Sequence, residues 1–381
     1  MALLAAITNA STAPAAGASS NPIVYTPGAA PPPPSSSALP TPIPPSTWTL
    51  APADPALATA ASFLVASLSN CSTLPRFRTL VGSFLTTLAQ SLSLPTPPAS
   101  VPKAIGALAA YLPATIASVV ASTAARLAEY EVLVALVESR LLPHPPPDLI
   151  STLSDSNRPD LVCAVLRQAS DLRSSEILAG LRCFLSPASE KAYDAMVDVK
   201  NRWREAAVLA VNRYRENVED KVVNAVTRKA ALLLMMGHDG FSSPEVCLHY
   251  LLASDNADSV VLGAAVAELD GGEVVRMMKY LNKWIEKYLR FPEAQPCPDA
   301  ASILGLEQCD SVPSFGAVAR ALGVLLDNHF SHLVLNADVR EDLRAVDAMM
   351  KELSAEAEAS GPILDLLHRL KQDKLHSRGS F

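Results

Sequence analysis

Two motifs that contain histidine have residue types and a spacing that could support chemistry. They are His329-x-x-His332 and Cys247-x-His249. His329 and His332 lie three residues apart, so one face of a helix would present both to a metal ion. A zinc site needs four convergent ligands, and only Asp327 lies at a companion spacing. We therefore expect no metal site here, but one surface histidine and one packed histidine.

The sequence Cys247-x-His249 suggests a nucleophile beside a base. Positions two apart on a helix point in different directions, whereas a catalytic pair must meet. The chain also lacks a Gly-rich phosphate loop, a Walker pattern and His-Glu-x-x-His. We expect no enzyme activity, no cofactor and no small-molecule substrate. The six cysteines include no C-x-x-C pair, which predicts buried, reduced thiols and a reducing compartment.

A locally basic segment, 191–229, stands out in a chain whose formal net charge is −7. RNA binding would need such clustered cations, with aromatic rings for stacking. However, Trp203 and Tyr214 fall on the apolar three- and four-residue steps of a helix, and nearby acidic residues suggest intrahelical pairing. We favour a solvated charged face together with a buried Trp203, with RNA contact possible but not favoured. Met235 and Met236 are expected core filler, although Met-rich faces also form adaptable binding grooves.

Helix start and stop signals place these residues on helices. Ser242 and Glu245 have the spacing of a capping box, and Pro159 stands where a first helical turn tolerates proline. Gly237 is expected to end a helix, because glycine adopts the left-handed conformation freely. No long period-two run predicts a sheet. The sequence therefore predicts an all-α fold, an irregular α-solenoid or a helical bundle.

The chain divides into four predicted parts, and Pro-rich stretches mark the first two boundaries. Residues 1–54 are rich in Pro, Ala and Ser, and predict a disordered tail. We expect a small helical hairpin with a Pro-rich linker over 55–100, an all-helical interaction domain over 101–377, and a disordered end at 378–381. The uncharged run 104–125 is long enough to span a bilayer, but it is mostly Ala, Ser and Thr with Pro113 inside. We expect no membrane span.

Two stretches carry a family resemblance. MMKYLNKWIEKYLRF places Leu281, Trp284 and Leu289 on one helix, and the segment after Ser314 contains Leu326-Asp-Asn-His-Phe330 before an apolar strip and a charged helix. Residues 230–357 resemble the C-terminal helical region of the nucleolar protein 11 family, components of the small-subunit processome that support ribosomal RNA transcription and early processing. In that family a β-propeller precedes the helices, where this chain has its Pro-rich tail. The resemblance implies a nuclear or nucleolar location and ribosome-assembly partners; the cytoplasm is the alternative.

The acidic balance and the scarcity of reactive motifs favour protein partners. The sequence thus predicts a non-catalytic helical scaffold or interaction protein. The alternative is an RNA-contacting factor that uses the basic helix 200–229. The candidate contact residues are Lys200, Trp203, Arg204, Arg213, Arg215 and Phe330.

Overall fold

The computed structural model describes residues 23–25, 48–50, 55–216, 221–253, 258–294, 296–297, 299–355 and 358. The fold is all-α, as the sequence predicts. Two three-residue strands, β1 (Ile23–Tyr25) and β2 (Trp48–Leu50), pair antiparallel and form a ribbon too short to define the fold. They lie within the predicted tail 1–54; the rest of that tail, the end at 378–381 and part of the predicted interaction domain lie outside the described residues.

The chain forms two compact units that divide between Tyr111 and Leu112. The first contains β1, β2, α2 (Pro55–Ser69), α3 (Leu74–Ser91), α4 (Val101–Leu108) and η2 (Ala109–Tyr111). Helices α2 and α3 pack as the predicted hairpin, and α4 packs on α3. Phe77, Val81 and Phe84 of α3 are buried in this unit. The structure therefore groups α4 with the hairpin, whereas the sequence places the division near residue 100.

The second unit begins with a series of short helices. These are α5 (Ala114–Arg126), α6 (Tyr130–Glu138), α7 (Leu149–Asp155), α8 (Pro159–Leu166) and α9 (Ser174–Leu185). Helix α5 packs on α6 and α7, α6 packs on α8, and α7 packs on α8 and α9, as neighbouring helices do in a solenoid. Left-handed residues other than glycine reverse the chain between them, among them Ala128, Arg140 and Asn157.

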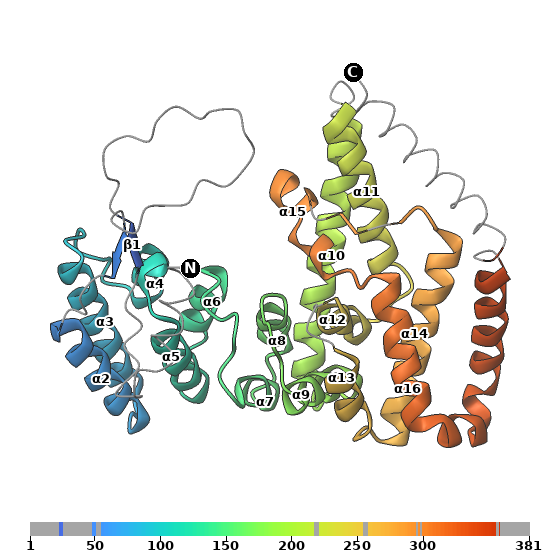
Figure 1. Ribbon diagram of the computed structural model, residues 1–381, viewed down its shortest axis with the longest axis horizontal. Coiled ribbons are helices and arrows are strands. Elements are labelled where there is room, and N and C mark those ends of the chain that lie inside the picture. The colour runs from blue at the N-terminus through green and yellow to red at the C-terminus, as the bar shows by residue number, and fades with distance from the viewer. Residues whose placement is uncertain are drawn as a thin grey trace. The chain divides into compact units, whose positions relative to one another are not determined.

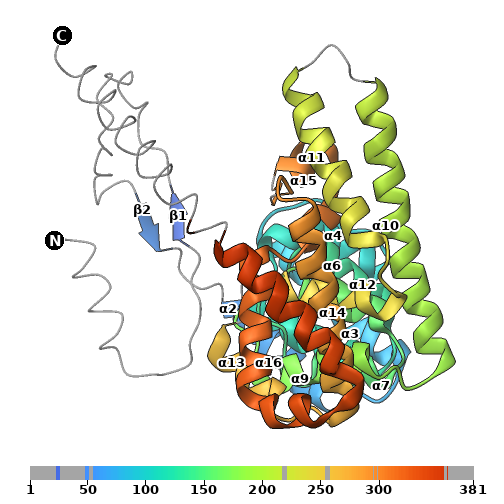
Figure 2. The same ribbon diagram turned by 90° about the vertical axis from the view of Figure 1, so that its right-hand side faces the viewer.

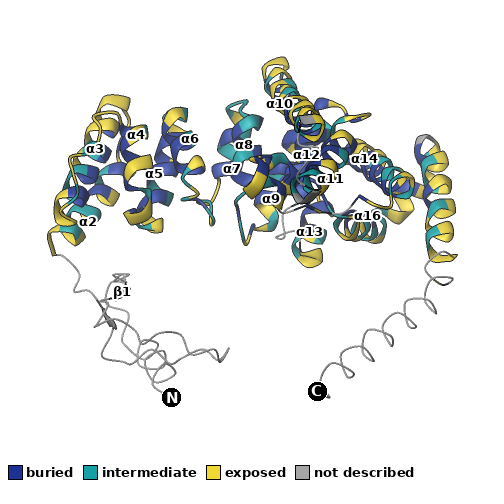
Figure 3. Cartoon of the chain, turned by 90° about the horizontal axis from the view of Figure 1, so that it is seen from above, coloured by how far each residue is buried: buried dark blue, intermediate teal, exposed yellow. Residues whose placement is uncertain are grey.

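Long and short helices together form a bundle in the rest of this unit (Figure 1). They are α10 (Glu190–Glu216), α11 (Lys221–His238), α12 (Ser243–Leu252), α13 (Ser259–Val266), α14 (Gly271–Arg290), α15 (Asp299–Leu304), η3 (Glu307–Ser311), α16 (Phe315–Leu335) and η4 (Ala337–Val339), followed by helical residues 340–355. Helix α10 packs along α11 and α12, and α14 packs along α16. Buried residues gather around α12 and α14, while many residues of α10 are exposed (Figure 3).

Two helix starts follow the predicted chemistry. The backbone N–H of Ser242 donates to Glu245 Oε2 at 2.6 Å, closing the predicted capping box of α12. Pro159 is the first residue of α8, as predicted. The helix end expected at Gly237 is correct to within one residue, since α11 ends at His238, but the left-handed position belongs to Gly240, with φ +76°. Close packing explains the glycine at 237, because a Cβ there would lie 2.5 Å from Cζ3 of Trp203.

Candidate functional site

A buried aromatic cluster holds α10, α11, α12 and α14 together. Its members are fully or almost fully buried and come from different helices and from the turn after α11: Trp203, Phe241, His249, Tyr250, Tyr280, Trp284 and Tyr288. The Trp203 indole N–H donates to the Tyr250 hydroxyl at 3.0 Å, which joins α10 to α12. The His249 ring lies 5.2 Å from the Trp203 ring and 5.0 Å from the Trp284 ring. This cluster fixes α10, α12 and α14 relative to one another.

His249 occupies the centre of a directed hydrogen-bond chain. Its Nε2–H donates to the Gly237 carbonyl at 2.8 Å, since a carbonyl can only accept. Its Nδ1 then accepts from the Tyr280 hydroxyl at 2.8 Å, and that hydroxyl accepts from the Trp284 indole N–H at 3.0 Å. Burial lowers the pKa of His249 from 6.5 to about 3. The chain of bonds needs a neutral ring, because a second ring proton would leave the Tyr280 hydroxyl without its acceptor.

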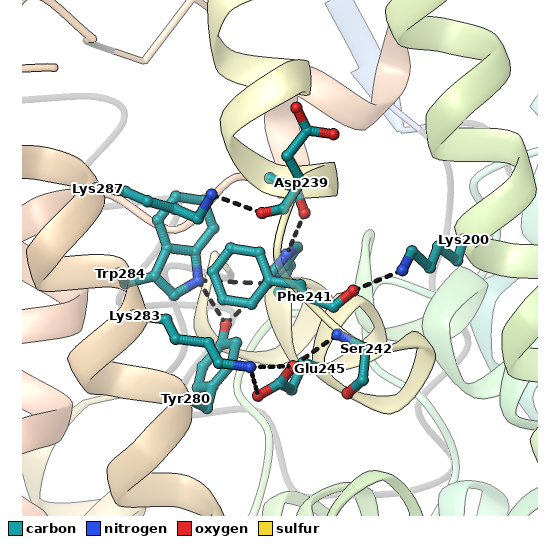
Figure 4. A network of polar contacts seen from close by, with 11 residues as sticks. Lys200, Asp239, Phe241, Ser242, Glu245, Tyr280, Lys283, Trp284 and Lys287 are labelled. Carbon is teal, nitrogen blue, oxygen red and sulfur yellow. Dashed lines mark hydrogen bonds and ion pairs between the residues drawn. The ribbon is translucent and has the colours of Figure 1, made fainter. Parts of the chain in front are cut away.

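Three lysines fix the turn between α11 and α12 (Figure 4). Lys200 donates to the Phe241 carbonyl and Lys287 to the Asp239 carbonyl, each at 2.6 Å. The Lys287 ammonium also lies 5.1 Å from the centre of the Phe241 ring, within the range of a cation–π contact. Lys283 donates to both carboxylate oxygens of Glu245, at 2.8 and 2.9 Å. These contacts hold α11 and α12 in a defined relative orientation.

Helices α10 and α11 extend side by side beyond α12 and α14 (Figures 1 and 2). Two adjoining hollows of about 740 and 460 Å³ run along this pair and share Val211 and Met235. We call them together the α10–α11 groove. Its apolar lining includes Val208, which is 54% exposed, Met235, which is 46% exposed, and Tyr214, which is 40% exposed.

Cations border this apolar lining. The exposed positive side chains at the groove are Arg204, Arg215, Arg228 and Lys229. Two carboxylates also lie there, Glu293 and Asp239, and the latter is 3.0 Å from His238 Nδ1. The groove therefore combines an apolar floor with a positive rim, in a chain that is acidic as a whole.

The predicted contact residues separate into three groups. Arg204 and Arg215 line the α10–α11 groove. Trp203, Lys200 and Arg213 serve the interior: Trp203 is fully buried, Lys200 binds the Phe241 carbonyl, and Arg213 donates to the Leu304 carbonyl. These three residues thus hold α10 in place.

Phe330 lies apart from the groove, on α16, and is 61% exposed. The preceding residue, His329, interrupts the helical backbone of α16 and contacts the Val266 carbonyl through Nε2 at 2.8 Å. His332 is exposed. The histidine pair thus contains one packed and one surface ring, as predicted. Among the residues that the structure describes, no three His, Cys, Asp or Glu side chains form a group that could hold a metal ion.

The cysteines are all buried and none forms a disulfide. Burial raises the pKa of the Cys183 thiol to about 11 and that of Cys309 to about 12, which disfavours the reactive thiolate. The two ring nitrogens of His249 form hydrogen bonds with the Gly237 carbonyl and the Tyr280 hydroxyl. Neither nitrogen is therefore directed at the Cys247 thiol as a base.

Sequence reasoning missed Val208 and assigned Met235 to the core. Met236 is buried, whereas Met235 faces the groove. The periodicity that predicts an apolar stripe is correct, but it cannot tell where the helix extends beyond its neighbours.

One segment of the described chain, Glu307–Leu335, is long and apolar enough to cross a membrane, with a mean hydropathy of 1.3 over its most apolar window. Buried residues make up 44% of that window, and α16 packs on α13 and α14. A core helix has the same properties, so this is weak evidence for a membrane span.

In the comparisons with known proteins, no family model and no curated protein matches this chain.

Proposed function

We propose that this protein is a non-catalytic helical interaction protein that binds an amphipathic helix of a protein partner in its α10–α11 groove. The observation that carries the proposal is the exposed apolar lining on a projecting helix pair with a cationic border. Large exposed apolar patches with polar rims are typical of interaction surfaces.

The spacing of the lining residues favours a helix as the occupant. On α10, Arg204, Val208, Val211 and Arg215 follow one another at steps of four, three and four residues, so they share one face. The two valines lie between the two arginines. On α11, Leu232 and Met235 supply the facing apolar side chains. A third helix lying along both would contact the apolar positions with its own apolar stripe, as in other helix-in-groove complexes.

Charge complementarity favours acidic residues at the borders of the partner helix. Arg204 and Arg215 lie at the two ends of the α10 face, and Arg228 and Lys229 lie on α11. Such rim charges contribute mainly to the association rate and to partner selection, while the apolar contacts contribute most of the affinity.

A ribosome-assembly factor in the nucleolus is the partner that the family resemblance suggests. We propose it on that ground alone, as the biological setting of the interaction. The proposed binding surface does not depend on this setting, since a cytosolic partner with the same acidic amphipathic helix would fit the α10–α11 groove.

Differential affinity purification with quantitative mass spectrometry tests the proposal. Met235→Glu places a carboxylate in the apolar lining, and its matched control, Leu209→Glu, alters another α10 side chain, 42% exposed, that does not line the groove. We expect a set of proteins retained by the wild type and by Leu209→Glu but reduced at least about tenfold by Met235→Glu, a change of about 1.4 kcal/mol in binding. Identical sets from all three proteins would refute the groove as the binding surface.

RNA is the second candidate, because Tyr214 and the four cations could also contact a nucleic-acid strand. Its test is binding of a labelled single-stranded RNA at two salt concentrations. Affinity that falls steeply with salt and is lost on Arg215→Glu would support RNA contact, whereas no measurable binding at low salt would remove it.

A further inference from the structure

A second groove lies on the second compact unit, between α9, α12 and α14 and the start of α10. It has a volume of about 570 Å³ and shares no lining residue with the α10–α11 groove. Phe184, Leu185 and Leu248 form a buried apolar floor, and Tyr193 of α10 borders it with a ring that is 45% exposed. We call it the α12–α14 groove.

One wall of this groove is cationic. Arg276, Lys279 and Lys283 follow one another on α14 at steps of three and four residues, so all three lie on the face that borders the groove. Their existing contacts differ. Lys283 is paired with Glu245, and Arg276 donates to the Ser186 hydroxyl at 2.6 Å. Lys279, which lies between them in sequence, is exposed. Arg276 is also exposed and Lys283 is half-buried, so all three cations are accessible to a ligand.

The start of α12 also borders the groove. Ser242 and Pro244 line the groove at the N-terminal end of this ten-residue helix. The Ser242 N–H is already bonded to Glu245 Oε2 and Pro244 has no N–H, so the side chains of α14 supply the positive charge of the groove. Glu190 and Glu245 also line the groove, and Glu245 is already neutralised by Lys283.

We propose that the α12–α14 groove binds a short acidic peptide segment, with one large apolar side chain of the peptide on the floor beside Tyr193 and its carboxylates against Lys279 and Arg276. The cations of α14 favour acidic residues in the peptide, and the apolar floor favours a large apolar side chain as its anchor. The proposal is independent of the α10–α11 groove, and together the two surfaces let one compact unit hold two partner segments at once, as a scaffold does.

Selection from a random 12-residue peptide display library on the full-length protein tests this inference. We expect enriched peptides that combine Asp or Glu with a Leu, Phe or Trp anchor. In fluorescence anisotropy, the best peptide should bind Lys279→Glu at least tenfold more weakly than the wild type, and its affinity should fall as salt rises. Lys103→Glu makes the same charge change on an exposed lysine of the other compact unit and should leave binding unchanged.

Three outcomes would overturn the inference: no enriched peptide, an enriched motif without acidic residues, or equal affinity for Lys279→Glu and Lys103→Glu. Met235→Glu separates this site from the proposed function, because it alters the α10–α11 groove alone and should leave the peptide affinity at its wild-type value.

Discussion

Acidification should destabilise the second compact unit through His249, which is fully buried and neutral in the folded state. Its pKa is about 3 when folded and 6.5 in the unfolded chain. Below pH 6.5 the unfolded chain binds a proton that the folded state does not. The stability that His249 contributes is therefore fully present above pH 6.5 and is lost progressively as the pH falls towards 3.

The size of the effect follows from the two pKa values. Each pH unit below 6.5 costs about 1.4 kcal/mol, so lowering the pH from 7.5 to 5.0 should remove about 2 kcal/mol from the free energy of unfolding. At pH 5.0 the folded ring stays neutral for any pKa below about 4, so this loss depends mainly on the unfolded value. Protonation of His249 Nδ1 in the folded state would break the hydrogen bond from the Tyr280 hydroxyl, and this loss disfavours the charged ring.

Urea unfolding followed by tryptophan fluorescence measures this loss. Trp203 and Trp284 lie in the same cluster as His249, so their emission reports on this part of the protein. We compare the wild type, His249→Gln and His144→Gln at pH 7.5 and 5.0. Groups that titrate in all three cancel in the comparison. His144→Gln removes an exposed histidine and is the matched control for the loss of a histidine side chain.

His249→Gln should be less stable at pH 7.5, and its further loss at pH 5.0 should be about 2 kcal/mol smaller than that of the wild type. Equal losses for His249→Gln and the wild type would refute the neutral buried ring. Side-chain ¹⁵N shifts of the wild-type protein provide a check that needs no variant: at pH 5.0 they should still report a neutral His249 ring, protonated on Nε2.

Four further substitutions test the packing and the backbone strain of the fold. Gly237→Ala should destabilise the protein by about 1–3 kcal/mol in urea unfolding, because the new methyl group meets the Trp203 ring. Gly323→Ala in α16, where a Cβ has open space, should stabilise the protein by about 0.5–1 kcal/mol in the same assay. Tyr280→Phe should cost about 1–3 kcal/mol in the same assay, since it removes the hydroxyl that joins the buried histidine to an indole. Ala128→Gly should raise the melting temperature by an amount equivalent to about 0.5–1 kcal/mol, because Ala128 is exposed and holds φ at +56°; a lower melting temperature would contradict the strain assigned to that residue.

Local sequence chemistry predicts much of the fold. The capping box of Ser242 and Glu245, the proline at the start of α8 and the helical spacing around Trp203 are all present as expected. Each depends on residues within one or two turns of the chain, and such short-range preferences can be read without knowing the tertiary structure.

The candidate site was only partly predictable, because it depends on where helices extend past their neighbours. Tyr214 lies on the same helical stripe as the buried Trp203, yet it is 40% exposed, since α10 continues beyond α12 there. The packing of the Trp203 ring against Gly237 is a contact between two helices, which no local pattern predicts. The bond between His249 and Tyr280 joins residues 31 positions apart on different helices, and periodicity carries no information about such pairs.

Hydroxyl-radical footprinting of the protein, free and bound to the partner recovered by affinity purification, tests the α10–α11 groove most directly. Met235 and Tyr214 line the groove, and Met350, which is 40% exposed in the helical segment 340–355, is an internal reference of similar accessibility. We predict that partner binding protects Met235 and Tyr214 from oxidation and leaves Met350 unchanged. Equal oxidation of Met235 in the free and bound protein would contradict the assignment of the groove as the partner-binding surface.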